Sequence, residues 1–158
     1  MSELQTIGRD ETIAVDALVD EVLVDLEPLA QEKEIKLIGN CKDTTMVGSD
    51  ILIYRMVYNL VENAIKYNHF GGQVTVTAYR SGKNICLSVE DTGSGIPAEL
   101  KERIFEPFFR VDKSRSRQLG GVGLGLALVH EIVRVHDGRI TVQSSPSGGT
   151  IFEVVFTQ

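Results

Sequence analysis

Hydrophobic residues recur at helical spacing in three stretches of the chain. Positions three or four apart in sequence share one face of a helix. The first stripe is Leu18, Val22, Leu26 and Leu29, and the second is Ile53, Val57, Leu60 and Ala64. They predict one helix that Asp16 caps and another from about Asp50 to Tyr67. The stretch from Leu124 to Val135 is apolar nearly all round, which is typical of a buried helix.

Alternating apolar and polar residues predict two β-hairpins. The first hairpin contains Val74, Val76 and Ala78, then a turn at 81–84, then Ile85, Leu87 and Val89. The second contains Ile140 and Val142, the turn S-S-P-S-G-G, then Phe152, Val154 and Phe156. Short strands are also expected near 12–15, 34–39 and 45–48. Because helices alternate with antiparallel hairpins, we expect an α/β (α+β) two-layer sandwich: a mixed, mainly antiparallel sheet with helices on one face.

Proline, glycine and polar runs mark the breaks between these elements. Pro28 lies inside the first predicted helix, so we expect a kink or an early end there. Between Pro97 and Val122 the periodic pattern weakens, and a polar connection of this length is usually functional or disordered. We interpret residues 97–122 as a mobile lid whose base is anchored by Phe105 and Phe108 of the run F-E-P-F-F.

Composition narrows the class of protein. The chain has 158 residues, with 42% hydrophobic and 24% charged residues and a formal net charge of −6. We expect a flexible lead-in at 1–11 and one domain at 12–158. An acidic chain is a poor general binder of nucleic acid. The two cysteines form no C-x-x-C pair, and neither a membrane span nor a signal peptide is evident, so a reduced, cytoplasmic setting is expected.

Three glycine clusters suggest a phosphate site: DTGSGIP from Asp91, GGVGLGLAL from Gly120, and GGT from Gly148. Glycines let backbone N–H groups approach a ligand, and a helix N-terminus attracts anions. Walker A does not fit, because Gly125 is followed by Leu126 rather than by Lys and Ser or Thr. The dinucleotide fingerprint does not fit either, because Leu126 or Leu128 stands where it needs a small residue. Glycine-rich turns without any ligand are at least as common, so this signal alone is weak.

A polar stripe accompanies the apolar one on the second helix. It consists of Asn59, Asn63, Lys66 and Tyr67, at positions i, i+4, i+7 and i+8. The plain interpretation is a helix face wetted by solvent. The alternative is a site for metal and phosphate, because an amide oxygen suits Mg²⁺ and Lys66 can pair with a phosphate. Asp91 likewise either starts a turn or, in a pocket, accepts the exocyclic amine of adenine.

Taken together, the motifs N-x-x-x-N-A-x-K-Y, D-T-G-S-G-I-P, F-E-P-F-F, G-V-G-L-G-L and G-G-T resemble one family. The resemblance is to the ATP-binding catalytic domain of bacterial sensor histidine kinases, in the ATPase class shared with gyrase, Hsp90 and MutL. It runs from about Thr12 to Thr157 and implies a Bergerat-type ATP-binding fold with ATP and Mg²⁺ bound.

The resemblance implies a role for each matching position. Asn63 would bind the metal with support from Asn59. Lys66 would reach a phosphate and Tyr67 would lie against adenine. Asp91 would read the adenine amine, with Thr150 supporting it and a bridging water as one route. Further positions that the resemblance assigns to the pocket, the lid and the phosphate loop are Gly93, Gly95, Ile96, Phe105, Phe108, Gly121, Val122, Gly123, Leu124, Gly125 and Leu126. The family often has threonine where Val122 stands, so one hydroxyl beside the phosphates is missing.

The resemblance also bears on the reaction. Gyrase-type relatives have at the position of Asn59 a glutamate that activates water, and asparagine cannot act as that base. A histidine acceptor needs positioning more than deprotonation, because its unperturbed pKa is about 6.5. Glu62 would orient the acceptor imidazole, unless it is a plain surface acid. Catalysis by Glu62, Asn63, Lys66 and Arg110 would then rest on placement and charge neutralisation.

The acceptor histidine is expected outside this chain. We interpret the histidines at 69, 130 and 136 as structural or surface residues. The implied partners are the kinase's own phosphoacceptor helical hairpin and a downstream response regulator, with no nucleic acid. The isolated domain is expected to be a monomer, and the full kinase a homodimer anchored in the membrane with this domain in the cytoplasm.

Two other functions remain open. One is a serine kinase of the same fold that acts as an anti-sigma switch, and the other is a nucleotide-sensing module without transferase activity. The K-Y after N-A and the F-E-P-F-F box favour the sensor kinases. Val122 favours the sensing module mildly, whereas Asn63, Asp91 and Lys66 count against it. The basic run at Arg110, Lys113, Arg115 and Arg117 lacks interleaved aromatics, so it fits a lid over phosphates better than a nucleic-acid patch.

Overall fold

The computed structural model describes residues 3–101, 103–106 and 124–158. Its helices are α1 (Val15–Glu32), α2 (Asp50–Lys66) and α4 (Leu124–Val135), with 3₁₀ turns η1 (Glu3–Thr6) and η2 (Ala98–Leu100). Its strands are β1 (Glu11–Ala14), β2 (Lys36–Cys41), β3 (Thr45–Gly48), β4 (Gln73–Ser81), β5 (Asn84–Asp91), β6 (Arg139–Ser144) and β7 (Thr150–Thr157). Within these residues, no helix has the length and apolar character needed to cross a membrane.

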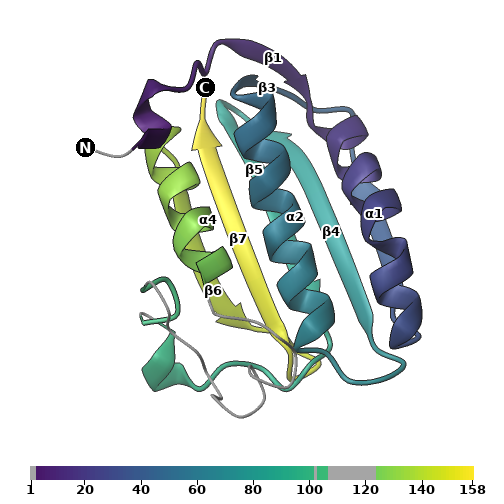
Figure 1. The fold of residues 1–158 in the computed structure, drawn as a ribbon. Helices are drawn as coiled ribbons and strands as arrows, with labels where there is room; N and C mark the ends of the chain where they lie inside the picture. The colour runs from purple at the N-terminus through teal and green to yellow at the C-terminus, as the bar shows by residue number, and fades with distance from the viewer. Residues whose placement is uncertain (1–2, 102, 107–123) are drawn as a thin grey trace.

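The strands form one large sheet that the helices cover on one face. The order is β2-β4-β5-β7-β6, in a sheet of five strands, and β1 pairs with β3 in a separate sheet of two. Only β2 and β4 run parallel within the large sheet, and its other pairings are antiparallel. Helices α1, α2 and α4 lie side by side in front of the sheet (Figure 1). The predicted two-layer sandwich with a mixed, mainly antiparallel sheet is therefore confirmed.

The core lies between the two layers, and α2 is its central helix. Ile53, Val57 and Leu60 of α2 are fully buried. Alternate residues of β4, β5 and β7 face them, in the period of two that a half-covered sheet requires. The same register separates the cysteines. Cys41 lies opposite buried Ala78, whereas Cys86 lies opposite exposed Tyr79, so the two thiols occupy opposite faces of the sheet.

The first helix differs from the prediction at both ends. It begins at Val15 after Ala14, so Asp16 lies in its first turn instead of capping it. The predicted early end at Pro28 is also wrong, because the helix continues to Glu32. Proline removes the hydrogen bond to the carbonyl four residues earlier, which belongs to Val24. Both Val24 and Pro28 are exposed, so water can bond that carbonyl and the helix tolerates the loss.

Three further details concern the N-terminal segment and β2. The predicted flexible lead-in contains η1, and Leu4 within it packs against the core. Glu11, its last residue, already belongs to β1. The strand expected at 34–39 starts later, at Lys36, because Glu34 has a φ of 52° and belongs to the turn after α1.

Candidate functional site

The asparagine stripe of α2 faces the start of α4. A β-carbon at Gly125 would lie 3.5 Å from Asn63 Nδ2 and 3.8 Å from Asn59 Cγ. Both asparagines are partly exposed, whereas Leu60 beside them is buried. The polar stripe thus flanks the core stripe, as the spacing predicted, and faces the glycine-rich N-terminal turn of another helix. The side chain of a larger residue at position 125 would occupy the space between α2 and the start of α4.

Glu62 and Lys66 are one turn apart on α2 and pair with each other. Glu62 Oε1 lies 3.8 Å from Lys66 Nζ, and the two side chains are 31% and 27% exposed. An exposed pair at this spacing contributes about 0.3–0.5 kcal/mol. Such a weak pair leaves either group able to turn toward a ligand of opposite charge. Tyr67, which follows, ends the helix as its C-cap.

Asp91 is the buried carboxylate of the site. It ends β5, its residue is 8% exposed, and its Oδ1 accepts hydrogen bonds from the N–H groups of Gly93 (2.8 Å) and Thr150 (3.3 Å). Burial raises the pKa of Asp91, although these two hydrogen bonds oppose the rise. Both bonds are to Oδ1, so Oδ2 takes no part in them. Thr150 contacts Asp91 through its main-chain N–H.

Glycines let three segments meet around this carboxylate. A β-carbon at Gly93 would lie 2.7 Å from Tyr67 O, and one at Gly149 would lie 1.9 Å from Asp91 O. Gly95 has a φ of 78°, and a β-carbon there would lie 2.7 Å from Gly148 O. Side chains at these positions would clash with backbone. The D-T-G-S-G and G-G-T motifs therefore bring the end of α2, the turn after β5 and the start of β7 into contact.

A buried amide network beneath Asp91 was missed by the sequence analysis. Asn68 is fully buried, and its Nδ2 donates to Gln73 O at 3.0 Å. Its Oδ1 accepts from the His69 N–H (2.9 Å) and from Thr92 Oγ1 (3.2 Å). This network ties the end of α2 to the turn that follows Asp91. The only signal for this network in the sequence was the polar residue Asn68 directly after Tyr67. A polar residue after a predicted helix is too common to interpret alone.

The base of the predicted lid packs on the core. Phe105 contacts the ring of His130 on α4, with centroids 5.4 Å apart, and the ring of Phe152 on β7, at 6.3 Å. Ile96 is also partly buried against the core. Phe108, Arg110, Gly121, Val122 and Gly123 lie outside the described residues. Leu124 begins α4, and Leu126 packs partly buried against the core.

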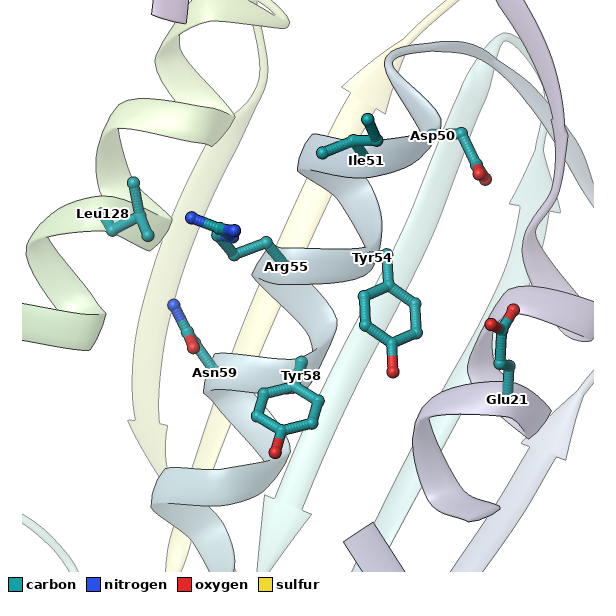
Figure 2. A pocket seen from close by; sticks show the side chains of 8 residues that line it. All are labelled: Glu21, Asp50, Ile51, Tyr54, Arg55, Tyr58, Asn59 and Leu128. Atoms are coloured by element: carbon teal, nitrogen blue, oxygen red, sulfur yellow. The ribbon is translucent and has the colours of Figure 1, made fainter. Parts of the chain in front are cut away.

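A separate groove of about 510 Å³ runs over the outer face of the helices. It is lined by Glu21, Asp50, Ile51, Tyr54, Arg55, Tyr58, Asn59 and Leu128. Figure 2 shows Tyr54 and Tyr58 on the α1 side of α2, and Arg55 and Asn59 on the α4 side. Of the predicted site residues, only Asn59 lines it. The groove therefore adjoins the site at Asn59 without containing Asp91.

The described residues hold no cluster of three or more His, Cys, Asp and Glu side chains suited to a metal ion. A metal in this site would therefore need amide oxygen and oxygens from a ligand. Asn63, whose amide group lies near Gly125 with Nδ2 as the nearer atom, carries one amide oxygen, and Mg²⁺ commonly takes few protein ligands and completes its shell with water and phosphate. The donor set on α2 fits that ion.

Comparison with known proteins agrees with this arrangement. The family model described as "Histidine kinase-, DNA gyrase B-, and HSP90-like ATPase" matches residues 48–158. The sensor-like histidine kinase SenX3 of Mycobacterium bovis is 40% identical over 141 residues, which cover 89% of this chain and 34% of that kinase. The chain thus spans about a third of the length of this relative.

Solved structures point the same way. The nucleotide-free catalytic domain of histidine kinase ThkA superposes with a TM-score of 0.84 at 27% identity, covering 95% of this chain and 96% of that one. ThkA in complex with the response regulator TrrA matches with a TM-score of 0.79 at 26% identity, covering 94% and 41%. The chain therefore belongs to the histidine kinase-, DNA gyrase B- and HSP90-like ATPase family, within the branch formed by the catalytic domains of sensor histidine kinases.

Proposed function

We propose that this domain binds Mg-ATP and transfers the terminal phosphoryl group to a histidine on a phosphoacceptor domain outside the chain, in two-component signalling. The observation that carries the proposal is the geometry at Asp91. A buried carboxylate is held through Oδ1 by two main-chain N–H groups, in a pocket walled by glycines. Such a group is oriented to accept a hydrogen bond through its other oxygen.

Asp91 would select adenine. Its Oδ2 would accept the exocyclic amine, and a hydrogen bond to a charged group contributes about 1.5–3 kcal/mol. Guanine has a carbonyl at that place, which a carboxylate repels. Tyr67 would lie against the base, because its backbone packs on Gly93 of the same turn. Gly95, Ile96 and Thr150 would complete the pocket.

The phosphates would lie between α2 and the start of α4. Asn63 would hold Mg²⁺ with support from Asn59, and the ion would neutralise phosphate charge. Lys66 would exchange its weak pair with Glu62 for a phosphate oxygen. Main-chain N–H groups of Gly121, Val122, Gly123, Leu124, Gly125 and Leu126 would surround the phosphates at the helix N-terminus. Arg110 would reach the terminal phosphate from a lid at 97–122, whose base is Phe105 and Phe108.

No side chain of α2 is needed as a strong base. Asn59 is neutral, and the acceptor imidazole has its own nucleophilic lone pair near pH 7. Glu62 would accept a hydrogen bond from the far ring nitrogen and so orient the acceptor. Its carboxylate is partly exposed on the same helix as Asn63, where an incoming side chain can reach it. The chain's contribution would then be orientation and charge placement.

The partners follow from this role. The kinase's own helical hairpin, the phosphoacceptor domain, would approach the site along the groove that ends at Asn59. A response regulator would receive the phosphoryl group from it, and the solved structure of ThkA in complex with the response regulator TrrA is a similar pairing. The isolated domain would be monomeric. The full kinase would be a homodimer anchored in the membrane, with this domain on the cytoplasmic side.

Calorimetric titration tests the nucleotide site. ATP and ADP should bind and GTP should not, and Mg²⁺ should strengthen ATP binding. Asp91→Ala should remove most of the preference for adenine, whereas Asn63→Ala should mainly reduce the effect of Mg²⁺. Equal binding of ATP and GTP by the unmodified chain would contradict the proposal.

Transfer of label tests the reaction. The chain is supplied with ATP labelled at the terminal phosphate and with separate candidate proteins that carry acceptor histidines or serines. Labelling of a histidine that survives alkali and is lost in acid supports the histidine kinase. Labelling of a serine would favour the anti-sigma kinase, and ATP binding without label on any candidate would favour the sensing module.

A further inference from the structure

Lys33 links the end of α1 to the end of α2. It is the C-cap of α1, and its N–H donates to Ala30 O. Its ammonium group crosses to the C-terminal end of α2. There Nζ lies 3.2 Å from Ile65 O, 2.9 Å from Lys66 O and 2.6 Å from Asn68 O. Three protons of one ammonium thus meet three main-chain carbonyls.

Two of these carbonyls, those of Ile65 and Lys66, belong to the last turn of α2, and the third, that of Asn68, follows the helix. The last four C=O groups of a helix have no partner within the helix. A cation at a helix C-terminus also interacts favourably with the helix dipole. Lys33 satisfies both requirements, and its own C=O accepts from the Gly71 N–H at 2.8 Å. The lysine therefore holds the segment from Ile65 to Gly71 through its side chain and its main chain.

The held segment supports the turn that follows Asp91. A β-carbon at Gly93 would lie 2.7 Å from Tyr67 O and 3.2 Å from Asn68 Cα, so the turn packs directly on this backbone. Asn68 Oδ1 also accepts from Thr92 Oγ1. The contacts form a continuous chain from Lys33 through Tyr67 and Asn68 to Gly93, and the Gly93 N–H donates to Asp91 Oδ1.

We propose that Lys33 is a positioning residue for the base pocket: its ammonium group sets the end of α2, and through it the orientation of the Asp91 carboxylate. Lys33 itself does not touch the nucleotide. Its loss should weaken binding of the base and leave the contribution of the metal unchanged. This inference rests on the proposed function, because it assumes that Asp91 reads adenine.

Lys33→Met tests the proposal, because methionine keeps an unbranched side chain only one atom shorter and removes the charge and the donors. We expect binding of ATP and ADP to weaken by about 10-fold each, with an unchanged ratio of ATP affinities with and without Mg²⁺. Lys33→Arg, which keeps the cation, should stay within about 3-fold of the unmodified chain. Lys36→Met is the matched control, because Lys36 is exposed and only three residues away. It should bind normally.

A second readout separates positioning from general destabilisation. In two-dimensional NMR spectra of the nucleotide-free protein, the Gly93 and Thr150 amide resonances should move in Lys33→Met and not in Lys36→Met. The proposal would be overturned if the Lys33→Met variant had a lower melting temperature but bound ATP normally and left these two resonances unmoved. If Lys33→Met does not fold, Lys33→Gln decides by the same two measurements. If the unmodified chain does not bind ATP, the proposed function itself fails.

Discussion

At the residue scale, Asp91 shows that recognition and stability make opposite demands. Desolvation raises its folded pKa above the ordinary value of 3.8, so the ionised form is disfavoured in the folded state. A group whose pKa is raised on folding contributes fully to the stability of the folded state below pH 3.8. That contribution is lost as the pH rises through the folded pKa. At neutral pH the charge that reads adenine therefore costs stability.

Asp91→Asn should separate these two effects. The asparagine Oδ1 can still accept the N–H groups of Gly93 and Thr150, while its amide group would meet the adenine amine donor to donor. We expect ATP affinity to fall by about 10- to 100-fold. The melting temperature of the nucleotide-free protein at pH 7 should stay equal or rise. Calorimetry measures the ATP affinity, and thermal melts measure the stability. A marked loss of stability in this variant would contradict the conclusion that the buried charge of Asp91 costs stability.

At the element scale, α2 is held from outside at both ends. Lys33 holds its C-terminal end, and at its N-terminal end Ser49 Oγ accepts the Leu52 N–H at 3.3 Å. His136, from the turn after α4, accepts the Ser49 N–H through Nε2 at 3.0 Å and bonds Ile132 O through Nδ1 at 2.8 Å. This arrangement requires a neutral imidazole with its proton on Nδ1. A helix that carries so many polar site residues is thus fixed in place by side chains of its neighbours.

The histidine contact predicts a pH dependence of stability. Burial lowers the pKa of His136, and nearby Arg9 lowers it further, whereas Asp137 and the bond to Ile132 oppose the shift. Its contribution to stability is therefore fully present above pH 6.5 and is lost as pH falls through the folded pKa. Protonation would also place a cation at the N-terminus of α2, where the dipole is unfavourable.

Thermal melts from pH 7.5 to pH 4.5 check this expectation. The unmodified protein should lose stability below pH 6.5, and His136→Gln should be less stable at pH 7 but vary less with pH. His130→Gln serves as the control, because His130 is exposed on the neighbouring helix and the pH dependence should persist. An identical pH profile for the unmodified protein and His136→Gln would contradict the role of this imidazole.

At the scale of the whole molecule, the site joins parts that are distant in sequence. The end of α2, the turn after β5 and the start of β7 meet at one end of the sandwich (Figure 1), and the first turn of α4 lies beside Asn59 and Asn63 of α2. Two of these contacts, Gly93 on Tyr67 and Gly149 on Asp91, are backbone to backbone. A ligand that contacts all four segments would therefore stabilise the fold as a unit.

Nucleotide binding should accordingly raise the melting temperature. A ligand at 100 times its dissociation constant stabilises by about 2.7 kcal/mol, which corresponds to a shift of about 5–10 °C for a chain of this size. Mg-ATP should produce this shift, and Mg-GTP at the same concentration should not. At the same nucleotide concentration the shift should fall to about half or less in Asp91→Asn, because its affinity is about 10- to 100-fold lower. A shift of equal size with both nucleotides would show that Asp91 does not select the base.

Local patterns in the sequence were enough to predict most of the elements, and the candidate residues were named from motifs alone. The apolar stripe at Ile53, Val57 and Leu60 predicted α2, and the alternation from Val74 to Val89 predicted the hairpin of β4 and β5. Both follow from periodicity, which depends only on neighbouring residues. Local rules failed at Pro28 and Asp16, where solvent access and the preceding strand decided how α1 begins and continues.

Periodic burial and ordered motifs along the chain were sufficient to predict the two-layer fold, the core stripe of α2 and the family. Three contacts came from the folded chain alone: Lys33 bonds carbonyls at the end of α2, His136 accepts the Ser49 N–H, and Asn68 joins the end of α2 to the turn after Asp91. These contacts join residues that pair through space. The choice among many surface lysines, histidines and asparagines depends on which backbone groups the folded chain leaves without partners.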